Sequence, residues 1–448
     1  MASGCARKIG IGRQPEDATG SENGAHNAMI SRNNFLPTLL LVIGAVTLVN
    51  CAPAVPCNIA GDGRVSRLRP NTTTNICGNG GGGTPTCSST LKPTQVLLSA
   101  DSKGNILEYG ISATPPVLTL MCNTATAAVG AIAVANNTFV YVLSQGKGTS
   151  PAQIFGFVIA HGNSGALAAI TGSPFTLSEA LPGNPSLVAD PLGRFMFVTN
   201  NATRSGDVHV LIIGQSGALT EATGSPFPVS APDFIAVNPA GTFAFVPDSM
   251  DGDIFIFSLD NNGKLTATAA SPFVIGMGNN APHFAVVHPN GNFLLTANEL
   301  TVSSFSIDNT GALTQVGGSP FSPGGAGDAQ VAPLAVTLDM SGKFLYVTPV
   351  GSSTTNPGIP GFQSENIVGF AFDPTAGGLT PVPMSPFIST STLDLIADPM
   401  VEQLFFVTSN TTSVLFDVAP IDASGNLTLP TTGLAVTAVV HPVVVNIN

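Results

Sequence analysis

Charged residues and tryptophan are what this sequence most clearly lacks. Only 9% of its 448 residues are charged and tryptophan is absent, whereas ordinary globular domains carry about 25% charged residues. The polar surface must therefore come from Ser, Thr, Asn and Gly, which suits strands and turns. No long window shows a sustained 3.6-residue hydrophobic period, so a strand-based protein is favoured over a helical one. Without a Trp-Asp dipeptide, a WD40 repeat is excluded.

Basic residues are also scarce. The chain has 14 of them against 26 acidic residues, which gives a net charge of −12. From Lys92 onward, seven basic residues accompany 22 acidic ones, so this region carries −15. Because phosphate backbones bind clustered Lys and Arg, the sequence predicts no nucleic-acid partner. An anionic membrane surface would repel this region too, so we expect membrane contact only through a lipid anchor.

The first 50 residues predict a leader with a signal peptide, in which Met29 is a possible true start. The apolar run at 35–49 is short for a membrane span and is typical of a signal-peptide core. It ends at Leu48-Val49-Asn50-Cys51, which resembles a bacterial lipoprotein cleavage box. We therefore expect export to the periplasm or cell surface, with lipid on Cys51. Plain secretion and an uncleaved anchor are the alternatives.

Residues 51–93 are rich in Pro, Gly and Thr and predict a flexible linker. Beyond Cys51, the chain has four cysteines at positions Cys57, Cys77, Cys87 and Cys122. Four cysteines allow three pairings, and the sequence does not choose among them. Since no C-x-x-C occurs among them, we expect no metal site there.

One phrase recurs at intervals of about 50 residues through positions 94–448. It consists of an aliphatic strand, a Pro-x-Gly turn and a strand that opens Phe-x-Phe-Val. The second strands begin at Phe139, Phe195, Phe243, Phe293, Phe344 and Leu404. A weaker seventh copy lies at 96–100. A unit of this kind cannot bury its own apolar face, so the copies must stack on one another.

Each copy continues with an alternating third strand, a turn such as Asp308-Asn309-Thr310-Gly311, and a fourth strand followed by Gly-Ser-Pro-Phe. Four short strands per repeat predict an all-β, seven-bladed β-propeller with four-stranded antiparallel blades. We expect the Phe of Gly-Ser-Pro-Phe to fill the groove between repeats. The run at 435–442 has no full repeat behind it and is expected to pair with the strand at 96–100, closing the ring. The rival fold, a β-solenoid, has shorter coils.

The most informative stretch is Pro282-His283-Phe284, followed by His288-Pro289-Asn290-Gly291 and Asn298-Glu299-Leu300. It resembles the 6-phosphogluconolactonase-type, seven-bladed propeller lactonases, whose motif reads P-R-H, two residues, an aromatic, H-P-N-G and later N-E-L. The resemblance covers about residues 94–445 and implies an active site at the family's Arg, His and Glu. Glu299 matches the Glu. His283 falls on the Arg or, after a one-residue shift, on the His, so the Arg is missing either way.

Lactone hydrolysis needs a base that activates water and a cation or dipole that faces the developing oxyanion. We expect His283 to be the base and Glu299 the group that orients it, with no cofactor and no metal. The missing Arg predicts a weak or divergent lactone hydrolase. The alternative is a non-catalytic, monomeric binding or scaffold propeller that takes a small molecule, a glycan or a protein at one face.

Other polar residues have structural interpretations. His209 lies in an alternating strand and is expected on its polar face. His288 and His441 precede Pro in predicted turns, where a side chain accepts a local hydrogen bond. The carboxylates of Asp248, Asp251 and Asp253 lack the spacing of an EF-hand and fit an ordinary hairpin.

Overall fold

The structure is a computed structural model. It describes residues 93–101, 104–111, 118–126, 130–146, 150–162, 165–202, 204–323, 332–350, 367–387, 392–409, 414–430, 433–436 and 439–447. All of these belong to one compact unit, Arg69–Asn448. The predicted leader, the linker up to residue 92 and the lipidation site Cys51 lie outside these ranges.

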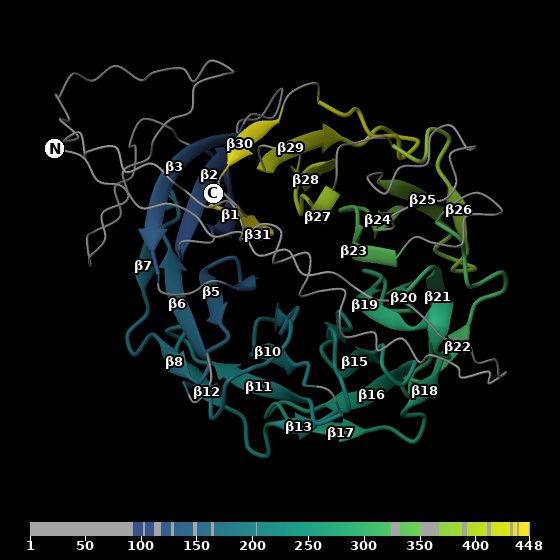
Figure 1. Cartoon of the computed structure of the whole chain (residues 1–448), viewed down its shortest axis with the longest axis horizontal. Helices are drawn as coiled ribbons and strands as arrows, with labels where there is room; N and C mark the ends of the chain where they lie inside the picture. Colours follow the sequence, from purple (N-terminus) through teal and green to yellow (C-terminus); the bar gives the residue numbers. More distant parts are fainter. Residues whose placement is uncertain are drawn as a thin grey trace, which may run out of the picture. The chain divides into compact units, whose positions relative to one another are not determined.

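The part of the chain that the structure describes forms seven antiparallel sheets arranged as blades in a ring (Figure 1). Blade 1 contains β31 (Val439–Asn446), β1 (Gln95–Asp101), β2 (Asn105–Ile111) and β3 (Leu118–Ala125). Blade 2 contains β4 (Ile132–Ala135), β5 (Phe139–Ser144), β6 (Gln153–Ile159), β7 (Leu167–Ala169) and β8 (Phe175–Thr176). Blade 3 contains β9 (Leu187–Ala189), β10 (Phe195–Asn200), β11 (Asp207–Ile213), β12 (Leu219–Glu221) and β13 (Phe227–Pro228).

The remaining blades follow the same order along the chain. Blade 4 contains β14 (Ala236–Val237), β15 (Phe243–Asp248), β16 (Asp253–Leu259), β17 (Leu265–Ala267) and β18 (Phe273–Val274). The short 3-10 helix η2 (Gly278–Asn280) leads into blade 5, which contains β19 (Pro282–Val287), β20 (Phe293–Asn298), β21 (Val302–Ile307) and β22 (Leu313–Gln315). Blade 6 contains β23 (Ala332–Leu338), β24 (Phe344–Val350), β25 (Val368–Phe372) and β26 (Leu379–Pro381). Blade 7 contains β27 (Thr392–Ala397), β28 (Gln403–Ser409), β29 (Val414–Pro420) and β30 (Leu434–Val436). The all-β, seven-bladed propeller with four-stranded blades is thus confirmed.

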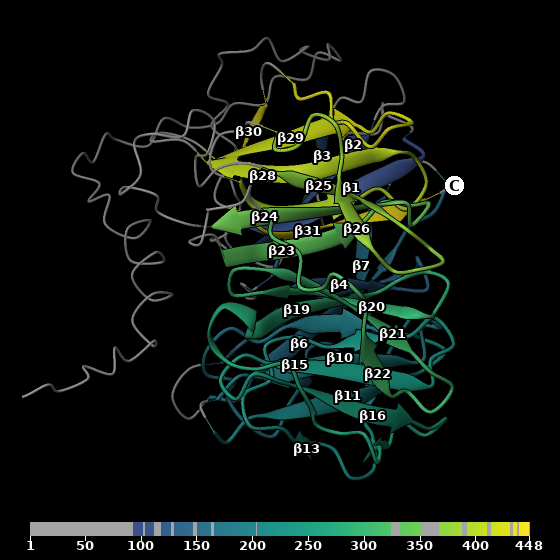
Figure 2. The ribbon, with the colours of Figure 1, turned by 90° about the vertical axis from the view of Figure 1, so that its right-hand side faces the viewer.

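The first strand of each blade lies innermost. First strands contact those of neighbouring blades, as β14 does with β19 and β19 with β23, and Figure 1 shows β19, β23, β27 and β31 around the centre of the ring. Figure 2 shows the blades from the side. Because the strands alternate in direction, the starts of the first strands share a face with the turns between second and third strands. We call this the N-face, and the opposite one the C-face.

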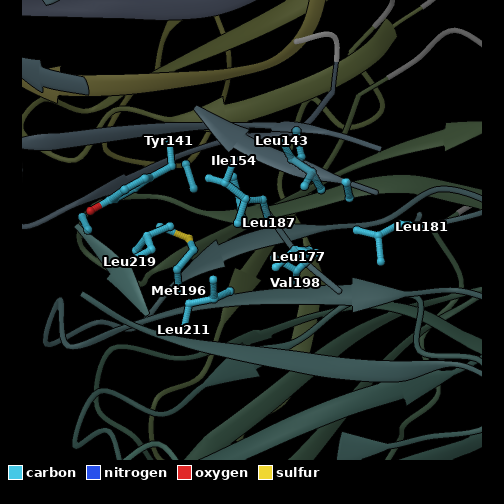
Figure 3. Close-up of a cluster of buried hydrophobic side chains, with 14 of the residues drawn as sticks. Tyr141, Leu143, Ile154, Leu177, Leu181, Leu187, Met196, Val198, Leu211 and Leu219 are labelled. Carbon is cyan, nitrogen blue, oxygen red and sulfur yellow. The ribbon is translucent and has the colours of Figure 1, made fainter. Parts of the chain in front are cut away.

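The core lies between neighbouring blades. Figure 3 shows one such cluster, in which Tyr141 and Ile154 of blade 2 pack with Met196 and Leu211 of blade 3. These four side chains are at most 3% exposed. Each blade therefore buries its apolar face against the next, as a stacked repeat requires.

In blades 2 to 6, the Gly-Ser-Pro-Phe motif or a variant of it joins the outer part of the blade to its third strand. Its Ser hydroxyl accepts a backbone N–H, from Val210 to Ser225 at 2.9 Å and from Ile256 to Ser271 at 2.9 Å. Its Phe packs against the core between blades, as expected, at positions Phe175, Phe227, Phe273, Phe321 and Phe387.

In blades 2 to 7, a glycine in the turn after the third strand lies against the preceding blade. Gly311 in blade 5 has φ 81°, which favours glycine, and a Cβ there would lie 2.6 Å from the ring of Phe243 in blade 4. The same contact joins Gly217 to Phe139 and Gly425 to Phe344. The first Phe of Phe-x-Phe-Val is therefore paired with a glycine about 70–80 residues later.

The C-terminal strand closes the ring, but its predicted boundaries were wrong. Strand β31 pairs with β1, with Val445 opposite Val96, whereas β30 pairs with β29 and completes blade 7. His441 therefore lies within a strand and not in an x-Pro turn. The register shifts between Leu98 and Ala100, opposite His441 and Pro442, and such an irregularity accommodates a proline that has no N–H to donate.

Cys122 in β3 is 1% exposed and forms a disulfide. Its partner lies outside the described ranges, so the choice among Cys57, Cys77 and Cys87 stays open.

Candidate functional site

His283 lies at the N-face, at the start of blade 5. The register between β19 and β20 shifts between Pro282 and Phe284, so His283 is the extra residue of a bulge. Bulges change the direction of a side chain and are frequent beside active sites. This irregularity lets the imidazole reach groups on both sides of it.

Two carboxylates flank the His283 ring. Its Nε2 lies 2.9 Å from Oε2 of Glu299, and its Nδ1 lies 3.3 Å from Oδ2 of Asp233. Glu299 follows β20 in the same blade, whereas Asp233 comes from blade 4. The side chains of His283, Asp233 and Glu299 are 28%, 16% and 37% exposed, so solvent and a small ligand can reach the cluster. The structure therefore brings His283 and Glu299 within hydrogen-bonding distance of each other.

Asp233 extends the cluster toward blade 3. It accepts a hydrogen bond from the side-chain amide of Asn201 and another, at 3.2 Å, from the backbone N–H of Ser249. A continuous polar row therefore runs from Asn201 through Asp233 and His283 to Glu299.

Sequence analysis missed Asp233 and Asn201. A repeated sequence could have identified Asp233, since Ala231-Pro232-Asp233-Phe234 in blade 4 matches Ala281-Pro282-His283-Phe284 in blade 5. Pro232 pairs with Asp248 as Pro282 pairs with Asn298. Asp233 and His283 therefore hold equivalent places in adjacent blades.

A buried polar network fixes the turn that carries Glu299. The Asn298 amide donates to the hydroxyls of Thr301, at 2.9 Å, and Ser303, at 2.8 Å. Its oxygen accepts a 2.7 Å hydrogen bond from Thr296. The backbone N–H of Glu299 donates to the carbonyl of Ala281 at 2.8 Å, next to the bulge. These bonds hold Glu299 opposite His283 before any ligand binds.

His283 is positively charged at neutral pH. Burial disfavours its charged form, but hydrogen bonds to and the charges of Asp233 and Glu299 outweigh this and raise the pKa of His283 to about 9. A protonated ring cannot accept a proton, so this raised pKa favours His283 as a cation rather than as a base. The catalytic roles expected for His283 and Glu299 stay predictions.

The other histidines and the Asp cluster have different surroundings. His288 accepts the N–H of Asn290 at its Nδ1 and bonds the carbonyl of Gly342 through Nε2, at 3.1 and 2.9 Å, so its structural role in the turn is confirmed. Asp248 accepts backbone N–H groups, including that of Ala231 at 2.9 Å. His209 lies on the polar face of β11, as expected, next to Asp207 and Glu221, although the fold buries its side chain completely.

Arg194 is not part of this site. It lies in the turn between β9 and β10, at the C-face, where its side chain bonds Asp190 at 2.7 Å and the carbonyl of Gly241 at 2.7 Å. A groove of about 510 Å³ also lies at the C-face, between turns that include Asn238, Asn290 and Asp308. The N-face cluster and this groove are therefore separate features.

The ring of seven sheets defines the class of the protein as a seven-bladed β-propeller. The sequence profile of the family described as lactonase, 7-bladed beta-propeller matches residues 100–440, and the chain belongs to that family. None of the curated proteins matches the chain in sequence.

Solved structures share the fold. A periplasmic gluconolactonase of Pseudomonas aeruginosa is 19% identical, with a TM-score of 0.62, over 79% of this chain and 99% of that one. A Bacteroides fragilis protein provisionally assigned as a 6-phosphogluconolactonase is 18% identical, with a TM-score of 0.62, over 79% and 98%. A Lactobacillus plantarum protein is 19% identical, with a TM-score of 0.59, over 78% and 99%. At this identity the likeness concerns the fold.

Proposed function

We propose that this protein is a slow lactone hydrolase that acts on uncharged lactones at the N-face. The observation that carries the proposal is the position of His283 between Asp233 and Glu299, with Nε2 at 2.9 Å from Glu299, where hydrogen bonds and charges raise the pKa of His283 to about 9. A fixed positive charge next to a carboxylate is the pair of groups that ester hydrolysis requires.

The proposed reaction is one hydrolysis. Glu299 takes a proton from water as the water oxygen attacks the lactone carbonyl carbon. The imidazolium of His283 stabilises the negative charge that develops on the carbonyl oxygen. The ring C–O bond then breaks, the alkoxide takes the proton from Glu299, and the product is a hydroxy acid. Asp233 is a positioning residue that keeps His283 protonated.

The charge of the site favours an uncharged substrate. Two carboxylates surround one imidazolium, so the cluster carries about one net negative charge. Both Asp233 and Glu299 would repel the phosphate of 6-phosphogluconolactone. The described part of the N-face offers Arg204, an exposed residue in the turn after β10, which makes no contact with this cluster in the structure.

The test is hydrolysis of glucono-δ-lactone by the purified protein, measured by pH-stat against a buffer blank. Glu299→Gln should lower kcat by about 100-fold or more, while Asp251→Asn, in the equivalent turn of blade 4, should leave it unchanged. Because His283 must be protonated, kcat/KM should fall as the pH rises past about 9. Efficient hydrolysis of 6-phosphogluconolactone, or activity unchanged in Glu299→Gln, would contradict the proposal.

A non-catalytic binding propeller is the second candidate. It is favoured by one observation: both ring nitrogens of His283 already face carboxylates, so neither is directed at a ligand. In that case the N-face binds a small molecule, a glycan or a protein without turnover. Ligand binding that is lost in Glu299→Gln, with no hydrolysis by the wild type, would support it.

Export with a lipid on Cys51 is also part of the proposal. It is supported by the apolar run before Cys51 and by the disulfide at Cys122, because disulfides persist in oxidising compartments. Fatty-acid labelling in a bacterial host should mark the wild type and not Cys51→Ala. Label that persists in the variant would remove Cys51 as the lipidation site.

A further inference from the structure

A second cluster of ionisable side chains lies apart from the His283 row. It contains Glu179, in the connection from blade 2 to blade 3, together with Asp207 and His209 of β11. One ligand atom of each lies within 4.8 Å of the others. We propose that these three residues form a binding site for a divalent transition-metal ion, of which Zn²⁺ is the one the geometry fits.

His209 provides the observation that points to a ligand. Its side chain is 0% exposed, and its Nε2 makes no hydrogen bond. The Oδ1 of Asp207, which faces it at 3.4 Å, is likewise buried without a hydrogen bond. Buried polar atoms in native proteins almost always have partners. A metal ion between these two atoms would supply one to each.

The spacing of the ligand atoms is that of a tetrahedral ion. His209 Nε2 lies 3.4 Å from Asp207 Oδ1 and 3.5 Å from Glu179 Oε1. An ion about 2.0–2.2 Å from each nitrogen and oxygen sets its ligands about 3.4 Å apart. Both separations from Nε2 therefore match a tetrahedral zinc site, and the ligand atoms of Asp207 and Glu179 lie within 4.8 Å of each other.

A second carboxylate orients the histidine. The Nδ1 of His209 lies 2.7 Å from Oε1 of Glu221, and the hydroxyl of Ser225 donates to the same oxygen at 2.9 Å. A carboxylate on the far nitrogen fixes the tautomer that leaves Nε2 free to bind a metal. This carboxylate–histidine arrangement is common around zinc.

The loop that carries Glu179 is anchored at both sides. Leu177 and Leu181 are 3% and 2% exposed and pack in the cluster between blades 2 and 3 (Figure 3). The backbone carbonyl of Glu179 accepts the N–H of Ala152 at 2.7 Å. The Glu179 side chain remains 44% exposed and gives an ion a path from solvent.

The charges also favour a cation. Glu179, Asp207 and Glu221 are three carboxylates around one imidazole, and even a protonated His209 would leave an excess of negative charge. One nitrogen and two carboxylate oxygens match zinc and its neighbours better than Ca²⁺, which prefers six or more oxygens. Three protein ligands leave a fourth position for water.

Isothermal titration calorimetry with Zn²⁺ alone, on chelator-treated full-length protein, tests the site. We expect one saturable site, and binding at least about tenfold weaker in Glu179→Gln. Zn²⁺ should also raise the Tm of the wild type, and it should raise that of the variant by less at the same Zn²⁺ concentration. Glu179→Gln is chosen because its exposed side chain can change without disturbing the core, and Asp207→Asn provides a second test.

His283→Gln is the matched control. His283 also lies between carboxylates, but they face its two ring nitrogens from opposite sides and so do not gather around one nitrogen as at His209. It should bind Zn²⁺ as the wild type does. Three results would overturn the proposal. They are no saturable Zn²⁺ binding by the folded wild type, Zn²⁺ binding by Glu179→Gln and Asp207→Asn that is as tight as that of the wild type, or tighter binding of Ca²⁺ than of Zn²⁺ by the wild type.

Discussion

At the scale of single residues, Glu108 shows how burial changes an acid. It lies in β2 and is 0% exposed. One carboxyl oxygen accepts a 2.8 Å hydrogen bond from Thr124, and the other has no hydrogen-bond partner. Burial raises the pKa of Glu108 to about 8, although the bond from Thr124 lowers it. Glu108 is therefore a neutral acid at pH 7, inside blade 1.

This shift predicts a pH-dependent stability. The folded state keeps the Glu108 proton above the unfolded pKa of 4.5, so stability from this residue is complete below that pH and is lost as the pH rises through about 8. Glu108→Gln should lose less stability than the wild type between pH 5 and pH 9, as measured by urea unfolding. Parallel pH curves for the two proteins would contradict this.

The sequence identified some site residues and missed others for a physical reason. Glu299 was found because it lies in a local motif, and His283 because it precedes the His-Pro turn in the same blade. Asp233 and Glu179 lie next to His283 and His209, which belong to other segments of the chain. Only the packing of the blades brings each carboxylate close to its histidine. The charge state of His283 was also out of reach, because its pKa depends on Asp233.

At the scale of elements, the repeat made the blades predictable. The Phe-x-Phe-Val strands begin where expected at β5, β10, β15, β20 and β24, and β28 begins one residue before Leu404. Alternating apolar residues and Pro-x-Gly turns are local signals, so strand positions follow from them. The strand boundaries near the C-terminus were harder to predict. His441-Pro442 has the sequence of the turns in other blades, but it lies within β31, where the pairing with β1 shifts register.

The turn glycines predict a specific cost of substitution. Gly311→Ala would place a methyl group 2.6 Å from the Phe243 ring and force alanine to φ 81°. Gly291 has φ 78°, but a Cβ there meets only the Pro239 ring, at 3.9 Å. Gly291→Ala therefore carries the backbone cost alone, about 1–2 kcal/mol, and Gly311→Ala should cost about 1–3 kcal/mol more.

Urea unfolding of both alanine variants measures this difference. Each variant should keep the far-UV circular dichroism of the wild type. Equal losses of stability would mean that the contact between Gly311 and Phe243 does not contribute to packing between blades 4 and 5.

At the scale of the whole molecule, ring closure depends on the last strand. Val445 and Ile447 are at most 1% exposed and pack with residues of blades 1 and 2. The N–H of Ile447 also donates to the carbonyl of Thr94, at 2.9 Å. Closing the ring in this way removes two open sheet edges.

Removal of residues 437–448 should therefore destabilise the propeller strongly. Each buried aliphatic side chain that is lost costs about 2–5 kcal/mol, and β1 would be left as an exposed edge. Differential scanning calorimetry should show a much lower Tm than that of the full chain. A truncated protein that melts within a few degrees of the full chain would show that β31 is dispensable.

Blade 1 contains β1, β2 and β3, which are synthesised first, together with β31, which is synthesised after all the other blades. Because β31 is the final strand along the chain, β1 has no inner neighbour while blades 2 to 7 are being synthesised. During that interval its edge can pair with another chain, which is how nascent β-proteins aggregate. The ring can close only after residue 446 has emerged, so ring closure follows the synthesis of all seven blades and blade 1 is completed last.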